Sequence, residues 1–306
     1  IKIFIKENYK FILSLIAIVF LLTYELPYVV YTPGGIVNLE KRISVKNGYD
    51  SKGSINMSYV TLRKGNIPSI LLSYVIKDWD LLKESEVTGS DESVDDLLKL
   101  EKIYMTSSID NATILAYKKA NKKINIKKNI NNVIYVSENA KTDISLYDII
   151  LSVDGKDINN IKELQDYIKT KNEGDIVYFK VISNKKEVDR KAEVININGE
   201  LKVGIAFLTT YEYETDPSIT VKTKSSESGS SGGLMLSLAI YNAITKEDIT
   251  KGKTIVGTGT IDVLGNVGKI DGVKYKILGA VKNKADLFIC PKDNYDEAMK
   301  VKKEHN

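Results

Sequence analysis

One serine of this chain stands in a context that suits nucleophilic chemistry. Residues 228–245 read SGSSGGLMLSLAIYNAIT, in which Ser231 precedes Gly232 and Gly233 and apolar residues at helical spacing follow. Glycines let backbone N–H groups approach another group closely, and the start of a helix favours negative charge. The stretch therefore predicts a serine nucleophile beside an oxyanion site, unless it is only a helix cap or a loop.

A serine nucleophile needs a base, and histidine is almost absent from the chain. The only histidine is His305, the residue before the last, so Ser-His-Asp and Cys-His sites are not expected, nor are zinc sites built from histidine and cysteine. The single cysteine, Cys290, cannot form an intramolecular disulfide. We expect no metal and no cofactor, and a lysine with a lowered pKa is the natural candidate base.

Two lysines follow the serine where a second helix is predicted. Residues 265–272 form a glycine-punctuated turn, and residues 273–281 have helical spacing. Lys274 opens this helix and Lys276 comes two residues later. Their side chains point about 200° apart around a helix, so they cannot serve equally as the base.

The elements around these residues predict a mixed architecture. Residues 254–263 read as a strand before the turn, and residues 285–291 read as a short buried strand before a further helix. Upstream, residues 131–138 and 146–158 read as strands, 161–170 as a helix and 176–182 as another strand. Residues 31–121 contain β-rich and helical stretches that indicate no activity by themselves.

The N-terminal residues predict a membrane anchor. Residues 11–24 carry no charge, and residues 9–26 as a helix would reach about 27 Å, close to the thickness of a hydrocarbon core. Lysines precede this run and none follows until Lys41, which predicts a cytoplasmic N-terminus with the bulk of the chain outside. A small-residue cleavage site is absent, which favours an uncleaved signal anchor over a cleaved signal peptide.

Nucleotide and nucleic-acid binding are not expected. The net charge of +4 is small and dispersed. Residues 251–254 read KGKT, like the end of a phosphate-binding loop, but Glu247 occupies the position of the first glycine of that motif.

Residues 122–196 resemble a PDZ domain. The stretches IILSVDGKDI and EGDIVYFKV carry this resemblance most specifically, although Tyr147-Asp148 stand where Gly-Asp is common. The resemblance implies that an extended peptide adds to a sheet edge, at Val133, Ile134, Tyr135 and Val136. The alternative is a β-rich spacer without a ligand.

Residues 200–306 resemble the Lon family proteolytic domain, in its ATPase-free branch of membrane-anchored PDZ proteases (the YlbL/SepM type). Gly229-Ser230-Ser231-Gly232-Gly233 is similar to the family motif Gly-Pro-Ser-Ala-Gly, and residues 271–276, DGVKYK, align with Gly-Gly-Leu-Lys-x-Lys. The resemblance implies Ser231 as nucleophile and Lys274 as general base, at a spacing that needs no gap. Thr258, in a matching Thr-Gly pair, would orient the lysine, and Gly232 and Gly233 would support the site.

The resemblances together imply an α+β protein with four parts: residues 1–30 as cytoplasmic tail and transmembrane helix, 31–121 as a β/helical region, 122–198 as PDZ domain, and 199–306 as an α/β Lon-type proteolytic domain of the ribosomal S5 domain 2-like fold, truncated at its C-terminus. They imply an ATP-independent serine endopeptidase at the bacterial cell membrane that cleaves peptides or proteins outside it. The substitutions at Ser230 and Gly232 motivate the alternative of a PDZ binding scaffold with an inactive protease domain. A homo-oligomer is left open.

Overall fold

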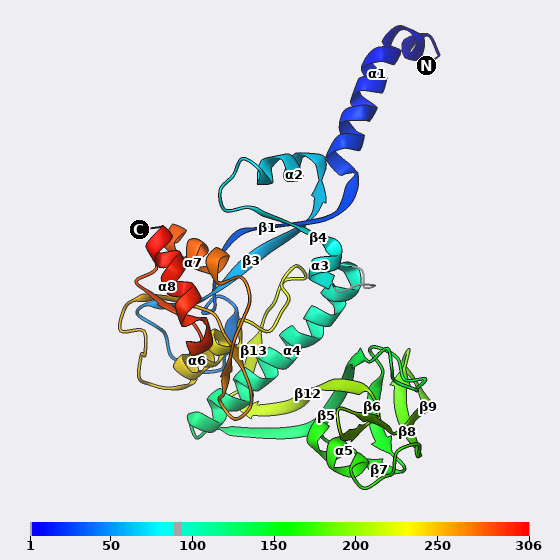
Figure 1. The fold of residues 1–306 in the computed structure, drawn as a ribbon. Coiled ribbons are helices and arrows are strands. Elements are labelled where there is room, and N and C mark those ends of the chain that lie inside the picture. Colours follow the sequence, from blue (N-terminus) through cyan, green and yellow to red (C-terminus); the bar gives the residue numbers. More distant parts are fainter. Residues whose placement is uncertain (1, 89–93, 306) are drawn as a thin grey trace.

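The computed structural model describes residues 2–88 and 94–305 of the chain. It has two bodies, each built around a sheet, and a long helix that runs between them (Figure 1). The molecule is α+β, in agreement with the class expected from the sequence.

The first body is built on a five-stranded sheet with the order β17-β14-β3-β1-β4. β1 pairs with β3 and β4 in antiparallel fashion, whereas β14 is parallel to both β3 and β17. The strands are β1 (Glu25–Asn38), β3 (Ser54–Asn66), β4 (Asp80–Lys83), β14 (Thr254–Gly257) and β17 (Leu287–Ile289). The sheet therefore joins strands of the predicted region 31–121 with strands of the predicted domain 199–306.

A continuous apolar core explains why these distant segments fold together. β14 reads TIVG and is buried over most of its length, so it needs a strand on each side to satisfy its backbone groups. Helices α6 (Gly233–Ile244), α7 (Val273–Lys282) and α8 (Tyr295–Glu304) accompany this sheet. Buried residues from both halves of the chain form the core, among them Leu39, Ile55, Tyr117, Met235 and Ile240.

The second body is a six-stranded sheet with the order β12-β5-β6-β8-β9 and with β7 paired to β6. Its strands are β5 (Lys123–Val136), β6 (Ile149–Val153), β7 (Lys156–Asp157), β8 (Ile176–Ser183), β9 (Lys186–Glu193) and β12 (Ile205–Asp216). Helix α5 (Ile161–Ile168) buries Leu164 and Ile168 in the core of this body, and Asn160 caps its first turn. β12 continues past the predicted domain boundary at 198 and belongs to this sheet.

The remaining elements connect or cover the two bodies. Two-stranded sheets pair β2 with β13, β10 with β11, and β15 with β16. These elements are β2 (Ile43–Val45), β10 (Ile195–Ile197), β11 (Glu200–Lys202), β13 (Ile219–Val221), β15 (Thr260–Ile261), β16 (Val267–Gly268), α2 (Ile67–Ser73), α3 (Glu84–Thr88) and the 3-10 turn η1 (Lys292–Asn294).

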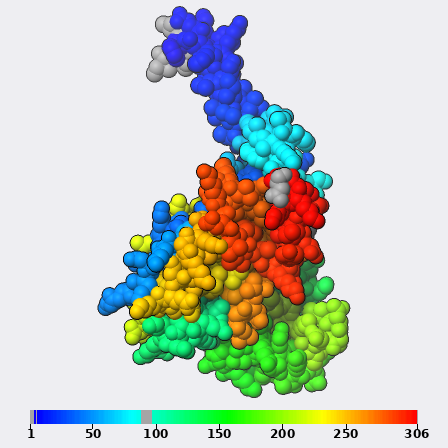
Figure 2. Space-filling model, turned by 90° about the vertical axis from the view of Figure 1, so that its left-hand side faces the viewer, coloured from blue at the N-terminus to red at the C-terminus, as the bar shows by residue number. Residues whose placement is uncertain are grey.

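The N-terminal helix differs from the sequence expectation. α1 spans Lys2–Thr23 and projects from the first body beside α2 (Figures 1 and 2). Within residues 2–88 and 94–305, none of the helices combines the length and the apolar character that crossing a membrane requires. The transmembrane helix predicted for residues 9–26 is therefore not supported, and the prediction of a single-pass membrane location is wrong. Lys6 and Lys10 add charge to α1, and the apolar run between Lys10 and β1 is short.

Helix α4 (Val94–Lys119) lies between the two bodies and contacts both. On one side it packs against α6, and on the other against β12. Asp110 joins α4 to β12 because its carboxylate accepts a hydrogen bond from the Tyr211 N–H at 2.8 Å. Burial raises the pKa of Asp110 to about 6, although the hydrogen bonds from Tyr211 and Tyr213 oppose that rise.

Asp110 therefore predicts a pH-dependent stability. An acid whose pKa is higher in the folded than in the unfolded state destabilises the fold as pH rises through that interval. Between pH 4 and pH 7, the free energy of unfolding of the wild type should fall by about 2–3 kcal/mol relative to that of Asp110→Asn, which lacks the titrating carboxyl group. Urea unfolding at several pH values measures this difference. The exposed Asp293→Asn is the control, and a parallel pH dependence of wild type and Asp110→Asn would contradict the assignment.

Candidate active site

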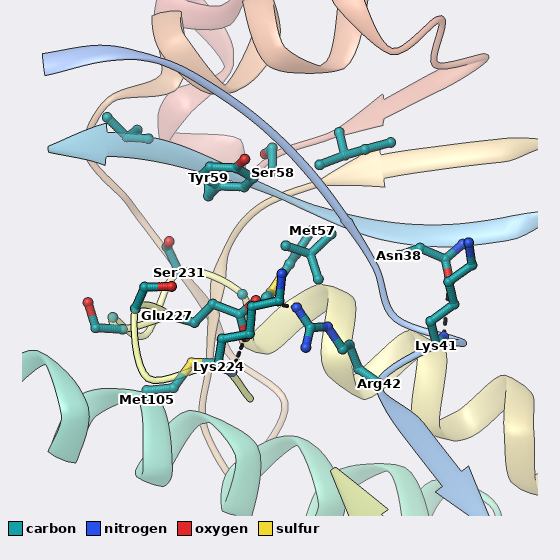
Figure 3. A pocket seen from close by; sticks show the side chains of 17 residues that line it. Asn38, Lys41, Arg42, Met57, Ser58, Tyr59, Met105, Lys224, Glu227 and Ser231 are labelled. Carbon is teal, nitrogen blue, oxygen red and sulfur yellow. Dashed lines mark hydrogen bonds and ion pairs between the residues drawn. The ribbon is translucent and has the colours of Figure 1, made fainter. Parts of the chain in front are cut away.

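Ser231 lies at the turn that leads into α6, at the wall of a cavity of about 590 Å³ (Figure 3). β1 and β3 contribute other walls, with Val37 and Met57 among the lining residues, and Met105 of α4 lies below. The loop before the serine brings Gly229 to the same cavity. The predicted nucleophile is thus open to a ligand and does not lie inside the core.

Two groups after β14 hold the main chain of Ser231. The carbonyl oxygen of Ser231 accepts a hydrogen bond from the Gly259 N–H at 2.7 Å and from the Thr258 hydroxyl at 3.0 Å. Thr258 is completely buried. The sequence predicted that this hydroxyl orients the lysine, whereas in the structure it positions the backbone of the serine.

The preceding residue is held just as firmly. The carbonyl oxygen of Ser230 accepts hydrogen bonds from the Gly233 N–H at 3.2 Å and from the Ser108 hydroxyl of α4 at 3.0 Å. The Leu234 N–H donates to the carbonyl of Gly259 at 2.9 Å. In the described part of the chain, by contrast, the N–H groups of Ser231 and Gly232 donate to no protein group. Both residues line the cavity, so their amides are candidates for an oxyanion site.

The two supporting glycines differ in the space around them. A Cβ at Gly233 would lie 2.6 Å from the Ser108 hydroxyl and 2.8 Å from a methyl carbon of Ile261. A Cβ at Gly232 would meet only the sulfur of Met57 closely, at 2.7 Å, and that sulfur belongs to a flexible side chain. Gly233 is therefore required for close packing, and Gly232 is not.

The two candidate lysines have opposite environments. The Nζ of Lys274 donates to the carboxylate of Asp80 at 2.9 Å and lies 3.8 Å from that of Asp78. Its amine is thus engaged by two carboxylates from the segment around β4. Lys274 therefore joins α7 to β4 in a way that does not suit a general base.

Lys276 has the environment that a base needs. Only 4% of its surface is exposed. Burial lowers the pKa of Lys276 to about 8, while the charges of Asp271, Glu101 and Glu297 oppose that shift. Glu101 in turn borders the serine loop, because its carboxylate oxygen lies 2.9 Å from where a Cβ on Gly229 would be. The Lys276 amine and the loop of Ser231 thus share one neighbour.

Burial and ion pairs thus distinguish Lys276 from Lys274, the lysine that the sequence predicted as the base. The pattern of α7 contained the signal. Val273, Lys276 and Ala280 fall on one helical face, and all three are buried. Lys274 lies on the other face, which carries polar contacts. A lysine inside an apolar stripe is unusual, and that position marks it as a functional candidate.

The predicted peptide-binding edge is not an edge of the sheet. Val133, Tyr135 and Val136 of β5 pair with residues 205–207 of β12, and Val133 also donates its N–H to the carbonyl of Asp148 on the side of β6. Ile134 lies at a register shift in the same pairing. Among the described strands, this sheet ends at β12 on the side of β5 and at β9 on the other side. The sequence did not show this, because residues 205–216 seemed to belong to the next domain.

Comparison with known families agrees with both bodies. The family model of the PDZ domain matches residues 124–194, and that of the Lon protease (S16) C-terminal proteolytic domain matches residues 221–306. The chain therefore contains a PDZ domain and a proteolytic domain of the Lon (S16) type, which supports a peptidase. The resemblance of these two regions seen in the sequence is confirmed.

Similar solved structures are PDZ domains of bacterial proteins. That of an SdrC-like protein from Listeria monocytogenes is 20% identical and covers 28% of this chain and 93% of its own, with a TM-score of 0.25. That of an SdrC-like protein from Listeria innocua is 26% identical and covers 26% of this chain and 92% of its own, with a TM-score of 0.24. A search among curated proteins found no match.

The contrast between the glycines predicts the effect of adding one methyl group. Gly233→Ala should destabilise the fold by about 1–3 kcal/mol, because the methyl group collides with α4 and β15. Gly232→Ala should fold with nearly wild-type stability, because Met57 can move. Thermal unfolding of both variants measures the difference. Equal effects of the two substitutions would refute the close packing at Gly233.

Proposed function

We propose that this chain is a serine peptidase with Ser231 as nucleophile and Lys276 as general base. One observation carries the proposal: a buried lysine with a pKa lowered to about 8 shares the neighbour Glu101 with the loop of a serine on a glycine-rich helix start. A lysine of this kind is neutral in a substantial fraction of molecules at mildly alkaline pH, so it can accept a proton. This combination supplies the base that the near absence of histidine requires.

The residues of the site suggest the order of events. Lys276 removes the hydroxyl proton of Ser231 while the serine Oγ attacks the peptide carbonyl carbon. The N–H groups of Ser231 and Gly232 stabilise the negative charge that develops on the carbonyl oxygen. The C–N bond then breaks, and protonated Lys276 gives its proton to the leaving amine. Water releases the acyl group from Ser231 by the same steps.

The cavity supports an extended peptide as substrate. Its apolar lining includes Ile36 and Val60 from neighbouring strands, and residues of the loop before Ser231 line it as well. The open edge of β12 offers the second body a place to add a strand, as PDZ domains do. We therefore infer that the PDZ domain binds one peptide segment while the cavity binds another.

The proposal is tested with the full chain and a library of internally quenched decapeptides. Ser231→Ala and Lys276→Met should each lower kcat/KM by at least about a thousandfold, whereas Lys274→Met should retain most activity. For the wild type, kcat/KM should rise with pH to a plateau, with a midpoint near the Lys276 pKa of about 8.

Each alternative gives a distinct result in that assay. If Lys274→Met is inactive and Lys276→Met is active, the base is the lysine that the sequence predicted. If the folded wild type cleaves no peptide but still binds library members, the chain is the binding scaffold that Ser230 and Gly232 motivated. Circular dichroism on every variant shows whether lost activity reflects lost folding.

The charge of the cavity predicts a substrate preference. Lys41, Arg42 and Lys224 line it, and Glu227 is the acidic residue among the lining side chains and pairs with Arg42. An excess of positive charge favours peptides with acidic side chains. Reversing both Lys41 and Lys224 to Glu should lower kcat/KM for acidic peptides roughly tenfold and leave that for uncharged peptides nearly unchanged. Lys46→Glu, outside the cavity, is the control, and equal losses on both peptide classes would disprove the preference.

A further inference from the structure

Three consecutive side chains of α4 point to three different environments. Thr106 is exposed and its hydroxyl returns to its own helix, at the carbonyl of Lys102. The hydroxyl of Ser107 donates to the carbonyl of Thr209 on β12 at 3.3 Å. The hydroxyl of Ser108 donates to the carbonyl of Ser230, beside the nucleophile, at 3.0 Å. One turn of one helix thus contacts the PDZ sheet and the serine turn.

Further contacts join α4 to the loop that precedes the nucleophile. The carbonyl of Glu101 accepts a hydrogen bond from the Gly229 N–H at 2.9 Å. The Nζ of Lys102 donates to the carbonyls of Ser225 and, at 2.8 Å, Glu227. Since these contacts and that of Ser108 cover residues 225–230, the conformation of the loop depends on the position of α4.

On its other side, α4 occupies part of the open edge of β12. The carbonyl of Thr209 and the N–H of Tyr211 face away from β5, toward Ser107 and Asp110. Backbone groups of every second residue in a strand point to the same side, so those of Phe207 face the same open edge as those of Thr209 and Tyr211. A peptide strand that pairs with Phe207 and continues along β12 reaches Thr209, where Ser107 already binds.

We propose that Ser108 is a positioning residue for Ser231, and that α4 couples this position to the open edge of β12. The inference rests on the proposed function. A peptide that extends to Thr209 displaces the Ser107 hydroxyl and shifts the equilibrium position of α4. This shift changes the hydrogen bond from the Ser108 hydroxyl to the Ser230 carbonyl. The coupling is reciprocal, so a substrate in the cavity also changes peptide binding at β12.

The first test compares Ser108→Ala with Thr106→Ala, its exposed neighbour. With the decapeptide library, Ser108→Ala should lower kcat about tenfold with little change in KM, because the nucleophile is misplaced while the cavity walls remain. Thr106→Ala should match the wild type. A rise in KM at unchanged kcat, or an equal effect of both substitutions, would overturn the positioning role.

The second test addresses the coupling. Ser107→Ala should also lower kcat, two- to fourfold, although its hydroxyl contacts the PDZ strand. In a Ser108→Ala background, Ser107→Ala should have a smaller further effect than in the wild type, because the direct connection to Ser230 is lost and only Glu101 and Lys102 still join α4 to the loop. Independent multiplication of the two effects, or wild-type kcat in Ser107→Ala, would refute the coupling through α4.

A third measurement keeps this inference separate from the proposed function. Hydrogen exchange of the amides in residues 225–233 should become faster in Ser107→Ala and in Ser108→Ala, and should stay unchanged in Thr106→Ala. This readout needs no catalysis, so it tests the coupling even if the wild type cleaves nothing. Unchanged protection in Ser107→Ala overturns the inference, whereas an inactive wild type with the expected exchange pattern overturns the peptidase assignment alone.

Discussion

The site depends on the two hydrogen bonds that the Ser231 carbonyl accepts from Thr258 and Gly259. These bonds fix the start of α6 to the end of β14, so Ser231, the proposed nucleophile, has a defined place relative to the central sheet. β14 in turn is held between β3 and β17. The position of one carbonyl group therefore links the serine to strands from both ends of the chain, and a rigid sheet sets its geometry.

Sequence reasoning identified the parts of the site that depend on local pattern. A serine among glycines before an apolar helix has a local meaning, and Ser231 lies where that pattern placed it, at a cavity wall. The choice between Lys274 and Lys276 was decided by tertiary contacts. Asp78 and Asp80, far away in sequence, bind Lys274, and burial in the core acts on Lys276. Lys276 lies on the same helical face as the buried Val273 and Ala280, whereas the motif alignment placed Lys274 at the base position.

Domain boundaries were harder to predict, because strands of one sheet need not be neighbours in sequence. β1 and β3 carry alternating patterns that reveal strands but not their partners, which lie about two hundred residues away. β12 stays paired with β5 over its whole length and also contacts α4, so a domain boundary at residue 198 separates a strand from the sheet to which it belongs. At the N-terminus, an apolar run suggested a bilayer, while the helix that forms there does not meet the requirements of a membrane span.

The order β17-β14-β3-β1-β4 also has a consequence for synthesis. β1 and β3 leave the ribosome first, yet β3 stays without its parallel neighbour until β14 has been made, after the entire PDZ body. Contacts so distant in sequence form late, because closing a long loop costs entropy before any pairing repays it. The Ser231 carbonyl and the wall around Lys276 therefore assemble only when nearly all of the 306 residues are present. A nascent chain that has passed the PDZ body therefore still lacks the hydrogen bonds that position Ser231, the proposed nucleophile.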